Sequence, residues 1–299
     1  MEEARDVRVG LGTAQFGLDY GITNRHGQVP VAEMNRILDL ALRRGVTILD
    51  TAGAYGTAEE RLGDAIGHSD DFDVVTKIPP LPPHLDGAAR TERFVEEAAS
   101  ISLAHLRMKG VRGLLMHAAG DLTGKHGAYA WRALERLRDG GAAEMIGASV
   151  YAGEELDALL QRYPLQIVQI PLSVFDQRLA RSGHLARLKS LGVEIHARSV
   201  FLQGVLLMTP EELPRHLAPL EDVLRQFRAA SAAAGRTPIQ AAMAYVLGYP
   251  EVDVAVVGAT TAEEFAAVLS ASSATLPGEW FAPFAVSDPN MVDPSRWTR

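Results

Sequence analysis

Three ionisable side chains end or interrupt apolar segments of the sequence, and a tyrosine follows closely behind the first. Asp50 ends "ILD", Lys77 interrupts "VVTKIP", His117 follows "GLLM", and Tyr55 lies five residues after Asp50. A buried charge is costly without a partner, so Lys77 needs a carboxylate, and Asp50 can supply it. An ammonium beside a phenol stabilises the phenolate, which predicts that the pKa of Tyr55 falls from about 10 toward neutrality. With His117 as a hydrogen-bonding group, the set predicts proton transfer to or from a carbonyl or alcohol oxygen.

Each of these residues also has a structural reading when it is taken alone. Asp50 can bond the amides of its own loop, Tyr55 and His117 can pack, and Lys77 can be an exposed charge. The prediction of one site therefore depends on the elements that bring the four together.

Eight short apolar segments alternate with helical patterns along the chain. They span residues 7–12, 46–52, 73–79, 111–118, 143–151, 165–170, 192–200 and 252–259. Continuous apolar runs of this kind are typical of parallel strands buried on both faces. Eight strands that are each followed by a helix predict a (β/α)8 TIM barrel, an α/β fold, as a single domain over residues 1–299. A doubly wound open sheet would need a G-x-G-x-x-G fingerprint, which "GLGTAQFG" does not match.

Several local signals mark the helices between these strands. Met34, Ile37, Leu38 and Ala41 recur at helical spacing before Gly45, and Thr57 with Glu60 has the spacing of a capping box. An extra helix is expected in the connection after the seventh strand, at about residues 205–238. The tail, residues 276–299, has no periodicity and is expected to pack over the barrel as a loop.

Composition limits the classes of function. With 299 residues, 47% hydrophobic and 22% charged, the chain has the composition of a soluble globular protein. The absence of cysteine excludes disulfides, thiolate catalysis and zinc–thiolate sites. No apolar run approaches the roughly 18 residues of a membrane span, and the polar N-terminus is unlike a secretory signal, so a cytoplasmic protein is expected. The net charge of −8 argues against nucleic-acid binding.

The motifs that carry these residues also resemble those of a known family. "GLGTAQFG", "ILDTAGAYGTAEERLG", "VVTKIP", "GLLMHA", "IGASVY" and "VVGATTAEEF" resemble the aldo-keto reductases in order and spacing, from about Val7 to Leu269. The resemblance implies that Tyr55 is the general acid in carbonyl reduction and the base in alcohol oxidation. It implies that Lys77 and Asp50 tune Tyr55 and that His117 orients the substrate carbonyl. It also implies a hydride from NADP(H) or NAD(H), bound extended across the barrel mouth, with no metal.

The same resemblance assigns positions around the nicotinamide. Ser149 and Gln169 match residues that hold its carboxamide, whereas Val150 stands where the family often has asparagine. Arg198 occupies a position often held by an aromatic residue that stacks on the ring, and a guanidinium plane can also stack. Only six residues precede the first strand, so the N-terminal hairpin that closes the barrel bottom in many relatives is expected to be absent.

Two further segments resemble parts of the cofactor site. "ARSVFLQGVL" is similar to the loop that covers the pyrophosphate, with comparable residues at Ser199, Leu202 and Gly204. In many relatives, Lys or Arg at the start of the helix after strand eight grips the adenosine 2′-phosphate. Residues 258–268 contain neither, and the positions expected to bind cofactor there are Gly258, Thr260, Thr261 and Glu264. A carboxylate suits a ribose hydroxyl and favours NAD, yet Glu264 also completes a capping box with Thr261. The choice between NADP and NAD stays open.

The first loop, "AQFGLDYGITNRHGQVP", offers candidate substrate contacts. It is rimmed by Phe16, Tyr20, Asn24 and His26, and it is either a plain connection or part of a substrate wall. A sugar would suit Tyr20 and Asn24, because rings stack on aromatic side chains and hydroxyls need polar partners. Two other functions remain open: a redox-sensing regulatory subunit that retains the cofactor site, and a barrel lyase or epimerase that uses the same lysine and tyrosine.

Overall fold

All eight expected strands form one closed parallel barrel, paired in the order of the chain. The computed structural model describes residues 8–67 and 69–297, and the expected absence of the N-terminal hairpin concerns residues outside these ranges. The strands are β1 Val9–Gly12, β2 Ile48–Asp50, β3 Asp73–Ile78, β4 Val111–Met116, β5 Ala143–Ser149, β6 Ile167–Pro171, β7 Glu194–Arg198 and β8 Val254–Gly258. The predicted (β/α)8 architecture is confirmed.

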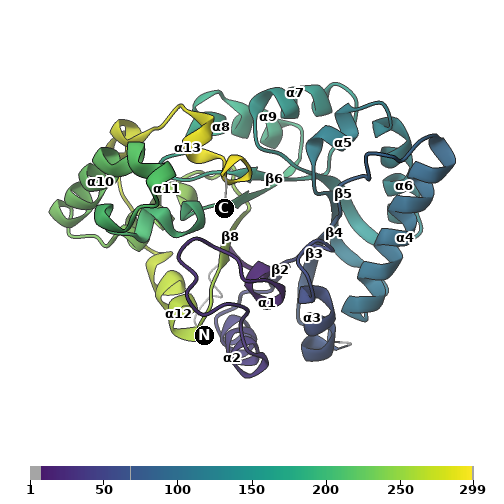
Figure 1. The fold of residues 1–299 in the computed structure, drawn as a ribbon, viewed down its shortest axis with the longest axis horizontal. Coiled ribbons are helices and arrows are strands. Elements are labelled where there is room, and N and C mark those ends of the chain that lie inside the picture. The colour runs from purple at the N-terminus through teal and green to yellow at the C-terminus, as the bar shows by residue number, and fades with distance from the viewer. Residues whose placement is uncertain (1–7, 68, 298–299) are drawn as a thin grey trace.

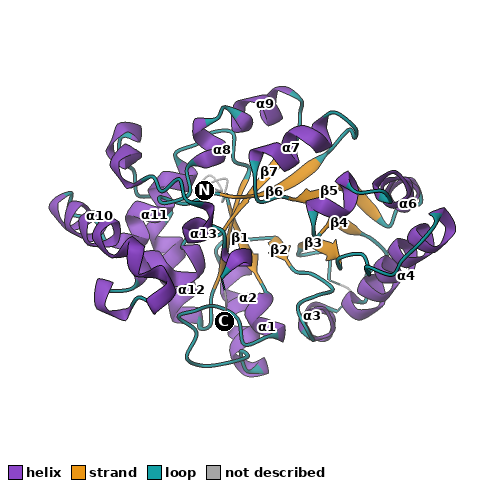
Figure 2. Ribbon diagram, turned by 45° about the horizontal axis from the view of Figure 1, so that its top comes forward, coloured by secondary structure: helices purple, strands orange, loops and turns teal. Residues whose placement is uncertain are grey.

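Helices surround the strands on the outside (Figures 1 and 2). The main helices that follow the eight strands in turn are α2 Val31–Arg43, α3 Ala58–Ile66, α4 Ala88–Leu106, α6 Gly127–Asp139, α7 Gly153–Leu160, α9 His184–Ser190, α11 Pro238–Leu247 and α12 Ala262–Ala271. Shorter helices are α1 Ala14–Gly17, α5 Ala119–Thr123, α8 Arg178–Arg181 and α13 Pro289–Val292. The 3₁₀ segments are η1 Leu202–Leu207, η2 Pro210–Glu212, η3 Arg215–Leu220, η4 Gly278–Phe284 and η5 Pro294–Arg296.

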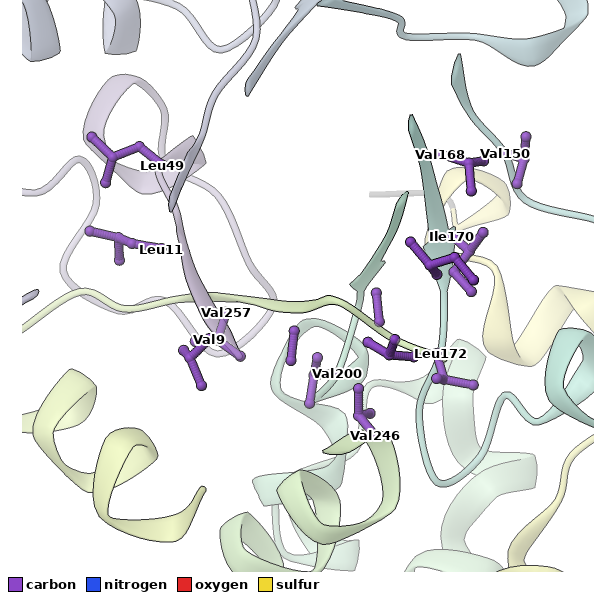
Figure 3. Close-up of a cluster of buried hydrophobic side chains, with 14 of the residues drawn as sticks. Val9, Leu11, Leu49, Val150, Val168, Ile170, Leu172, Val200, Val246 and Val257 are labelled. Atoms are coloured by element: carbon purple, nitrogen blue, oxygen red, sulfur yellow. The ribbon is translucent and has the colours of Figure 1, made fainter. Parts of the chain in front are cut away.

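Alternation along each strand divides the apolar side chains into two groups. Figure 3 shows outward-facing residues such as Leu11, Leu49 and Ile170, which belong to the large cluster between the strands and the helices. Val75, Leu115 and Ile167 form a separate small cluster with Met145, and they fill the barrel interior. Since side chains two residues apart share a face, the residues that follow this inner group by two positions also point inward.

The first long helix follows its sequence signals, whereas the expected capping box at Thr57 is wrong. Met34, Ile37, Leu38 and Ala41 are the buried residues of α2. At α3, however, Thr57 makes no side-chain cap. Its hydroxyl instead accepts a hydrogen bond from Gln28 Nε2 at 3.0 Å, and Glu60 Oε1 lies 3.3 Å from His105 Nε2. Partners from other elements therefore displace the local pairing.

The connection after β7 and the tail pack against each other. This connection contains α10, Glu221–Ala233, and its Phe227 lies against Trp280 and Phe284 of η4. The tail differs from the expected loop, because it forms η4, α13 and η5. The tail also contacts α11 and the segment after β6. Phe281 lies against Tyr245 of α11, and Val286 N donates a hydrogen bond to Phe175 O at 2.8 Å. Apolar aromatic side chains without periodicity thus form short helical turns that cover one flank of the barrel.

An ion pair crosses the N-terminal end of the barrel. Arg112 of β4 donates to Glu194 of β7 at 2.6 Å, and Glu194 also pairs with the fully buried His196, Oε1 to Nε2, at 2.8 Å. Burial opposes ionisation of Glu194, but the hydrogen bonds and charges of His196 and Arg112 outweigh it and lower its pKa to about 2. The ionised carboxylate is therefore stabilised by the folded state.

We expect Glu194→Gln to lower the free energy of unfolding at pH 7 by about 1–3 kcal/mol. The folded pKa lies below the unfolded one, so this stabilisation is complete above about pH 4.5 and is lost as the pH falls toward 2. Urea unfolding of both proteins between pH 7 and pH 3 should show the difference shrinking on acidification. Glu97→Gln, at an exposed carboxylate of α4, is the control and should show little effect. A difference that is independent of pH would contradict the assignment.

Candidate active site

Six of the predicted residues lie inward at the C-terminal end of the barrel. Lys77 follows Val75 by two residues, His117 follows Leu115, and Gln169 follows Ile167, so each continues an inward-facing row. The other three are Asp50, Ser149 and Arg198, at the last residues of β2, β5 and β7. Parallel strands end at one mouth, so residues distant in sequence share this layer.

Asp50 and Lys77 form a buried, bidentate ion pair. Lys77 Nζ donates to Asp50 Oδ1 at 2.8 Å, to Oδ2 at 2.9 Å and to Thr51 O at 2.8 Å, and the residues are 1% and 4% exposed. Gln169 Nε2 adds a hydrogen bond to Asp50 Oδ1 at 2.6 Å. Burial lowers the pKa of Lys77, and Asp50 opposes this by stabilising the ammonium. The carboxylate is the partner that the sequence required for Lys77.

Tyr55 and His117 lie against this pair. Lys77 Nζ is 5.1 Å from the centre of the Tyr55 ring, and the Tyr55 and His117 rings meet edge to face with their centres 5.8 Å apart. The structure thus brings Asp50, Tyr55, Lys77 and His117 together.

The predicted direction of the Tyr55 pKa is wrong. Burial raises this pKa well above 10, and the negative charge of Asp50 raises it further. Asp50 neutralises the Lys77 charge, so the ammonium does not lower the pKa as the sequence suggested. The phenol of Tyr55 is therefore protonated throughout the neutral pH range and is suited to donate a proton.

His117 is a neutral hydrogen-bonding group. Burial and, after it, the nearby charges of Lys77 and Arg198 lower its pKa to about 4, although Asp50 opposes them. Its Nδ1 is buried and has no hydrogen-bond partner among the described residues. At neutral pH the uncharged imidazole can donate one hydrogen bond to a substrate oxygen without bringing a charge.

Two glycines hold the Tyr55 loop against the first loop. A Cβ at Gly17 would lie only 1.8 Å from the carbonyl oxygen of Tyr55, and one at Gly56 only 2.5 Å from that of Gly17. Gly56 also has φ +58°, which other residues adopt at a cost. Arg61 fixes the contact by donating to the backbone oxygens of Phe16 and Val29. The sequence analysis missed this role, although both glycines lie within motifs that it quoted.

Ser149 and Gln169 have hydrogen-bonding capacity suited to a carboxamide. They are 2% and 1% exposed. Ser149 Oγ accepts a hydrogen bond from Arg198 Nε at 3.3 Å, so its own proton remains available to a ligand. The side-chain nitrogen of Gln169 donates to Asp50, so its side-chain oxygen is the atom that can accept a hydrogen bond from a ligand. One donor and one acceptor side by side fit the amide of nicotinamide.

Arg198 stacks on an aromatic side chain that the sequence analysis did not single out. Its guanidinium carbon lies 4.0 Å from the centre of the Tyr151 ring. It also donates to Val150 O at 2.9 Å and to Ser199 Oγ at 3.2 Å. Tyr151 comes two residues after Ser149 in "GASVY", so its place at the strand tip was the available signal. Val150 itself is fully buried, and its backbone oxygen takes part in the site.

The segment after β7 has an unusual backbone. Ser199, Leu202 and Gln203 have φ of 59°, 49° and 52°, and Gly204 has φ 95°. Left-handed non-glycine residues cost roughly 1 kcal/mol or more each and cluster at functional loops. A Cβ at Gly204 would lie 2.3 Å from Thr23 Oγ1, so this segment touches the first loop closely. Ser199–Gly204 is therefore a left-handed strap that packs against the first loop.

The two candidate substrate residues of the first loop differ. Phe16 is fully buried in the main hydrophobic cluster, so it packs in the core and cannot line a substrate wall. Tyr20 is partly buried, and its hydroxyl accepts a hydrogen bond from Gln203 Nε2 at 3.2 Å. Tyr20 therefore connects the first loop to the strap.

Carboxylates surround the start of α12. Glu264 Oε2 accepts from Thr260 N at 2.8 Å and from Thr260 Oγ1 at 2.7 Å, while Thr261 Oγ1 accepts from Glu264 N at 3.1 Å. Glu264 thus has the capping role, reaching Thr260 rather than Thr261. Glu33 of α2 accepts from Ala262 N at 2.6 Å, which the sequence did not indicate.

The other end of the barrel holds a cavity of about 670 Å³, lined by residues such as Asp73, Val111 and Glu144 at the starts of β3, β4 and β5. It lies opposite the mouth and touches none of the four predicted catalytic residues. Among the described residues there is no group of three or more His, Asp or Glu side chains placed to hold a metal. In the same ranges, no helix has both the length and the apolar character needed to cross a bilayer.

A closed parallel barrel of eight strands with a buried Asp–Lys pair, a tyrosine and a histidine at its mouth places this chain in the (β/α)8 barrel class. Residues 8–285 match the profile of the Aldo/keto reductase family, and the chain belongs to that family. It is 26% identical over 297 residues to "Aldo-keto reductase YhdN" of Bacillus subtilis, covering 91% of this chain and 87% of that protein.

Solved structures share the fold. The holo form of aldo-keto reductase AKR11C1 from Bacillus halodurans has a TM-score of 0.75 at 20% identity and covers 97% of this chain and 95% of its own. The glycerol dehydrogenase AKR11B4 from Gluconobacter oxydans has a TM-score of 0.68 at 22% identity, with coverages of 96% and 92%. Family membership places the chain among oxidoreductases that generally reduce carbonyls with NAD(P)H.

Proposed function

We propose that this protein reduces an aldehyde or ketone with a nicotinamide cofactor, or oxidises the corresponding alcohol, with Tyr55 as the general acid or base. The observation that carries the proposal is the convergence of Tyr55 and His117 on the Asp50–Lys77 pair at the barrel mouth. The cofactor would supply or accept the hydride at the carbonyl carbon.

The chain's own residues account for the proton and for orientation. The Tyr55 hydroxyl donates its proton to the carbonyl oxygen, and the raised pKa keeps it protonated until then. Neutral His117 donates a hydrogen bond to the same oxygen and fixes its direction. Lys77, held by Asp50, lies 5.1 Å from the centre of the Tyr55 ring and helps to fix the phenol at the mouth.

Ser149 and Gln169 would hold the carboxamide, and the Ser199–Gly204 strap would cover the pyrophosphate. The buried Gln169 oxygen and the Ser149 proton described above support the first assignment, and the left-handed backbone supports the second. We propose a small polar carbonyl or sugar as substrate, with Tyr20 near its entry.

For the cofactor we propose a preference for NAD(H). Relatives grip the 2′-phosphate at the helix after strand eight, and here Glu33 already occupies the Ala262 amide at that position. Arg36, the nearest cation of α2, is paired with Glu33 at 2.8 Å and with Glu263 at 2.6 Å. A 2′-phosphate there would be repelled by the carboxylates of Glu33, Glu263 and Glu264, whereas a ribose 2′-hydroxyl could donate a hydrogen bond to a carboxylate.

Fluorescence titration should give a Kd for NADH at least about tenfold below that for NADPH, equivalent to about 1.4 kcal/mol. A panel of aldehydes, ketones and sugars, followed by the absorbance of the reduced nicotinamide, should then show turnover with NADH. Tighter binding of NADPH than of NADH would contradict only the proposed NAD preference and would leave the oxidoreductase proposal standing. Cofactor binding without turnover, together with a stoichiometric partner in a pull-down, would favour a regulatory subunit. Turnover without a change in nicotinamide absorbance would favour a lyase or epimerase.

A further inference from the structure

Arg198 carries a positive charge at the mouth and has no carboxylate partner among the residues that the structure describes. Its hydrogen bonds go to Ser149 Oγ, Ser199 Oγ and Val150 O, which are all neutral oxygens. No ion pair to Arg198 occurs within residues 8–67 and 69–297. With Lys77 neutralised by Asp50, the guanidinium leaves the site with a net positive charge.

The guanidinium is held in place. Three hydrogen bonds and the stack on Tyr151, 4.0 Å away, fix it at the tip of β7. Its charge reaches all of the proposed reacting groups. Burial is the largest cause of the lowered pKa of Lys77 and of His117, and the Arg198 charge lowers both further. Burial also raises the pKa of Tyr55, and there the Arg198 charge acts in the opposite direction.

We propose that Arg198 makes the cofactor site selective for redox state, so that the protein binds the reduced cofactor more tightly than the oxidised one. This rests on the proposed function. In the proposed reaction, the carbon that receives the hydride carries the oxygen that receives the Tyr55 proton. The nicotinamide ring would therefore lie close to Tyr55 and within the electric field of Arg198. The oxidised ring is cationic and the reduced ring is neutral, so a fixed cation disfavours only the oxidised form. The oxidised cofactor would then dissociate readily after carbonyl reduction.

The expected size follows from Coulomb's law. At an effective dielectric constant near 20, a unit charge several ångströms away changes a binding constant by about tenfold to a hundredfold. Arg198 is partly exposed, and solvent screening places the expectation at about tenfold.

The test is the ratio of the two dissociation constants, oxidised over reduced, measured by calorimetry for the full-length protein. The pair used is whichever of NAD(H) and NADP(H) binds more tightly. The wild type should give a ratio of about ten or more. Arg198→Gln keeps hydrogen-bond donors but removes the charge, and should lower the ratio about tenfold. Arg198→Lys keeps the charge and should hold the ratio within about threefold of wild type.

The outcomes separate this inference from the proposed function. Binding of both forms with an unchanged ratio in Arg198→Gln overturns the role of Arg198 and leaves the oxidoreductase standing. Failure of the wild type to bind either form overturns both. If Arg198→Gln does not fold, the wild type decides: its ratio should shrink as the ionic strength rises from about 0.05 M to about 0.5 M. A ratio that is indifferent to salt overturns the proposal.

Discussion

Tyr55→Phe should lower carbonyl turnover by about 10²–10⁴-fold while the cofactor Kd stays within about threefold of wild type. The substitution removes only the hydroxyl, and the ring keeps its place between Lys77 and His117. Without the hydroxyl, the oxygen of the reduced substrate has no positioned proton donor, because Lys77 is committed to Asp50 and Thr51. Steady-state kinetics together with cofactor titration would measure both quantities.

Tyr129→Phe is the matched control, since Tyr129 lies on α6 outside the barrel and contacts Arg132. We expect it to retain wild-type turnover. A fully active Tyr55→Phe would refute the role of Tyr55 and with it the proposed mechanism. Loss of cofactor binding in that variant would instead indicate that the tyrosine supports the cofactor site.

Lys77→Met should lower the free energy of unfolding by about 3–5 kcal/mol. The substitution leaves the Asp50 carboxylate buried, with Gln169 as its remaining side-chain partner. Removing one member of a buried ion pair is costly because the other charge then has neither water nor a counter-ion. Urea unfolding followed by circular dichroism measures the loss.

The double variant Asp50→Asn and Lys77→Met separates charge from packing. It removes both charges, so we expect it to recover most of the loss and to lie within about 2 kcal/mol of wild type. It should still lack activity, because the ammonium that packs against the Tyr55 ring is gone. If the double variant were less stable than Lys77→Met alone, the cost would come from packing, and the assignment of an uncompensated buried charge would be wrong.

Contacts between distant segments override two local signals of the sequence. Thr57 and Glu60 have the spacing of a capping box, but Gln28 and His105 come from elsewhere in the chain and take their hydrogen bonds. Phe16 looks like the rim of a loop, yet the loop folds back and buries it. In each case a contact between distant segments overrides a local signal.

By itself, the sequence determined the eight-stranded barrel and the meeting of Asp50, Lys77 and His117 at its mouth. Strand alternation and the ends of parallel strands are local properties, and they place residues on a face and at an end without knowledge of any contact. Only the tertiary structure decided the direction of the Tyr55 pKa and the capping role of Glu264. It also decided that Arg198 has no carboxylate partner in the described part of the chain. These three features depend on desolvation and on which distant side chain forms each hydrogen bond. Desolvation and hydrogen-bond partners are both set by how the chain packs in three dimensions.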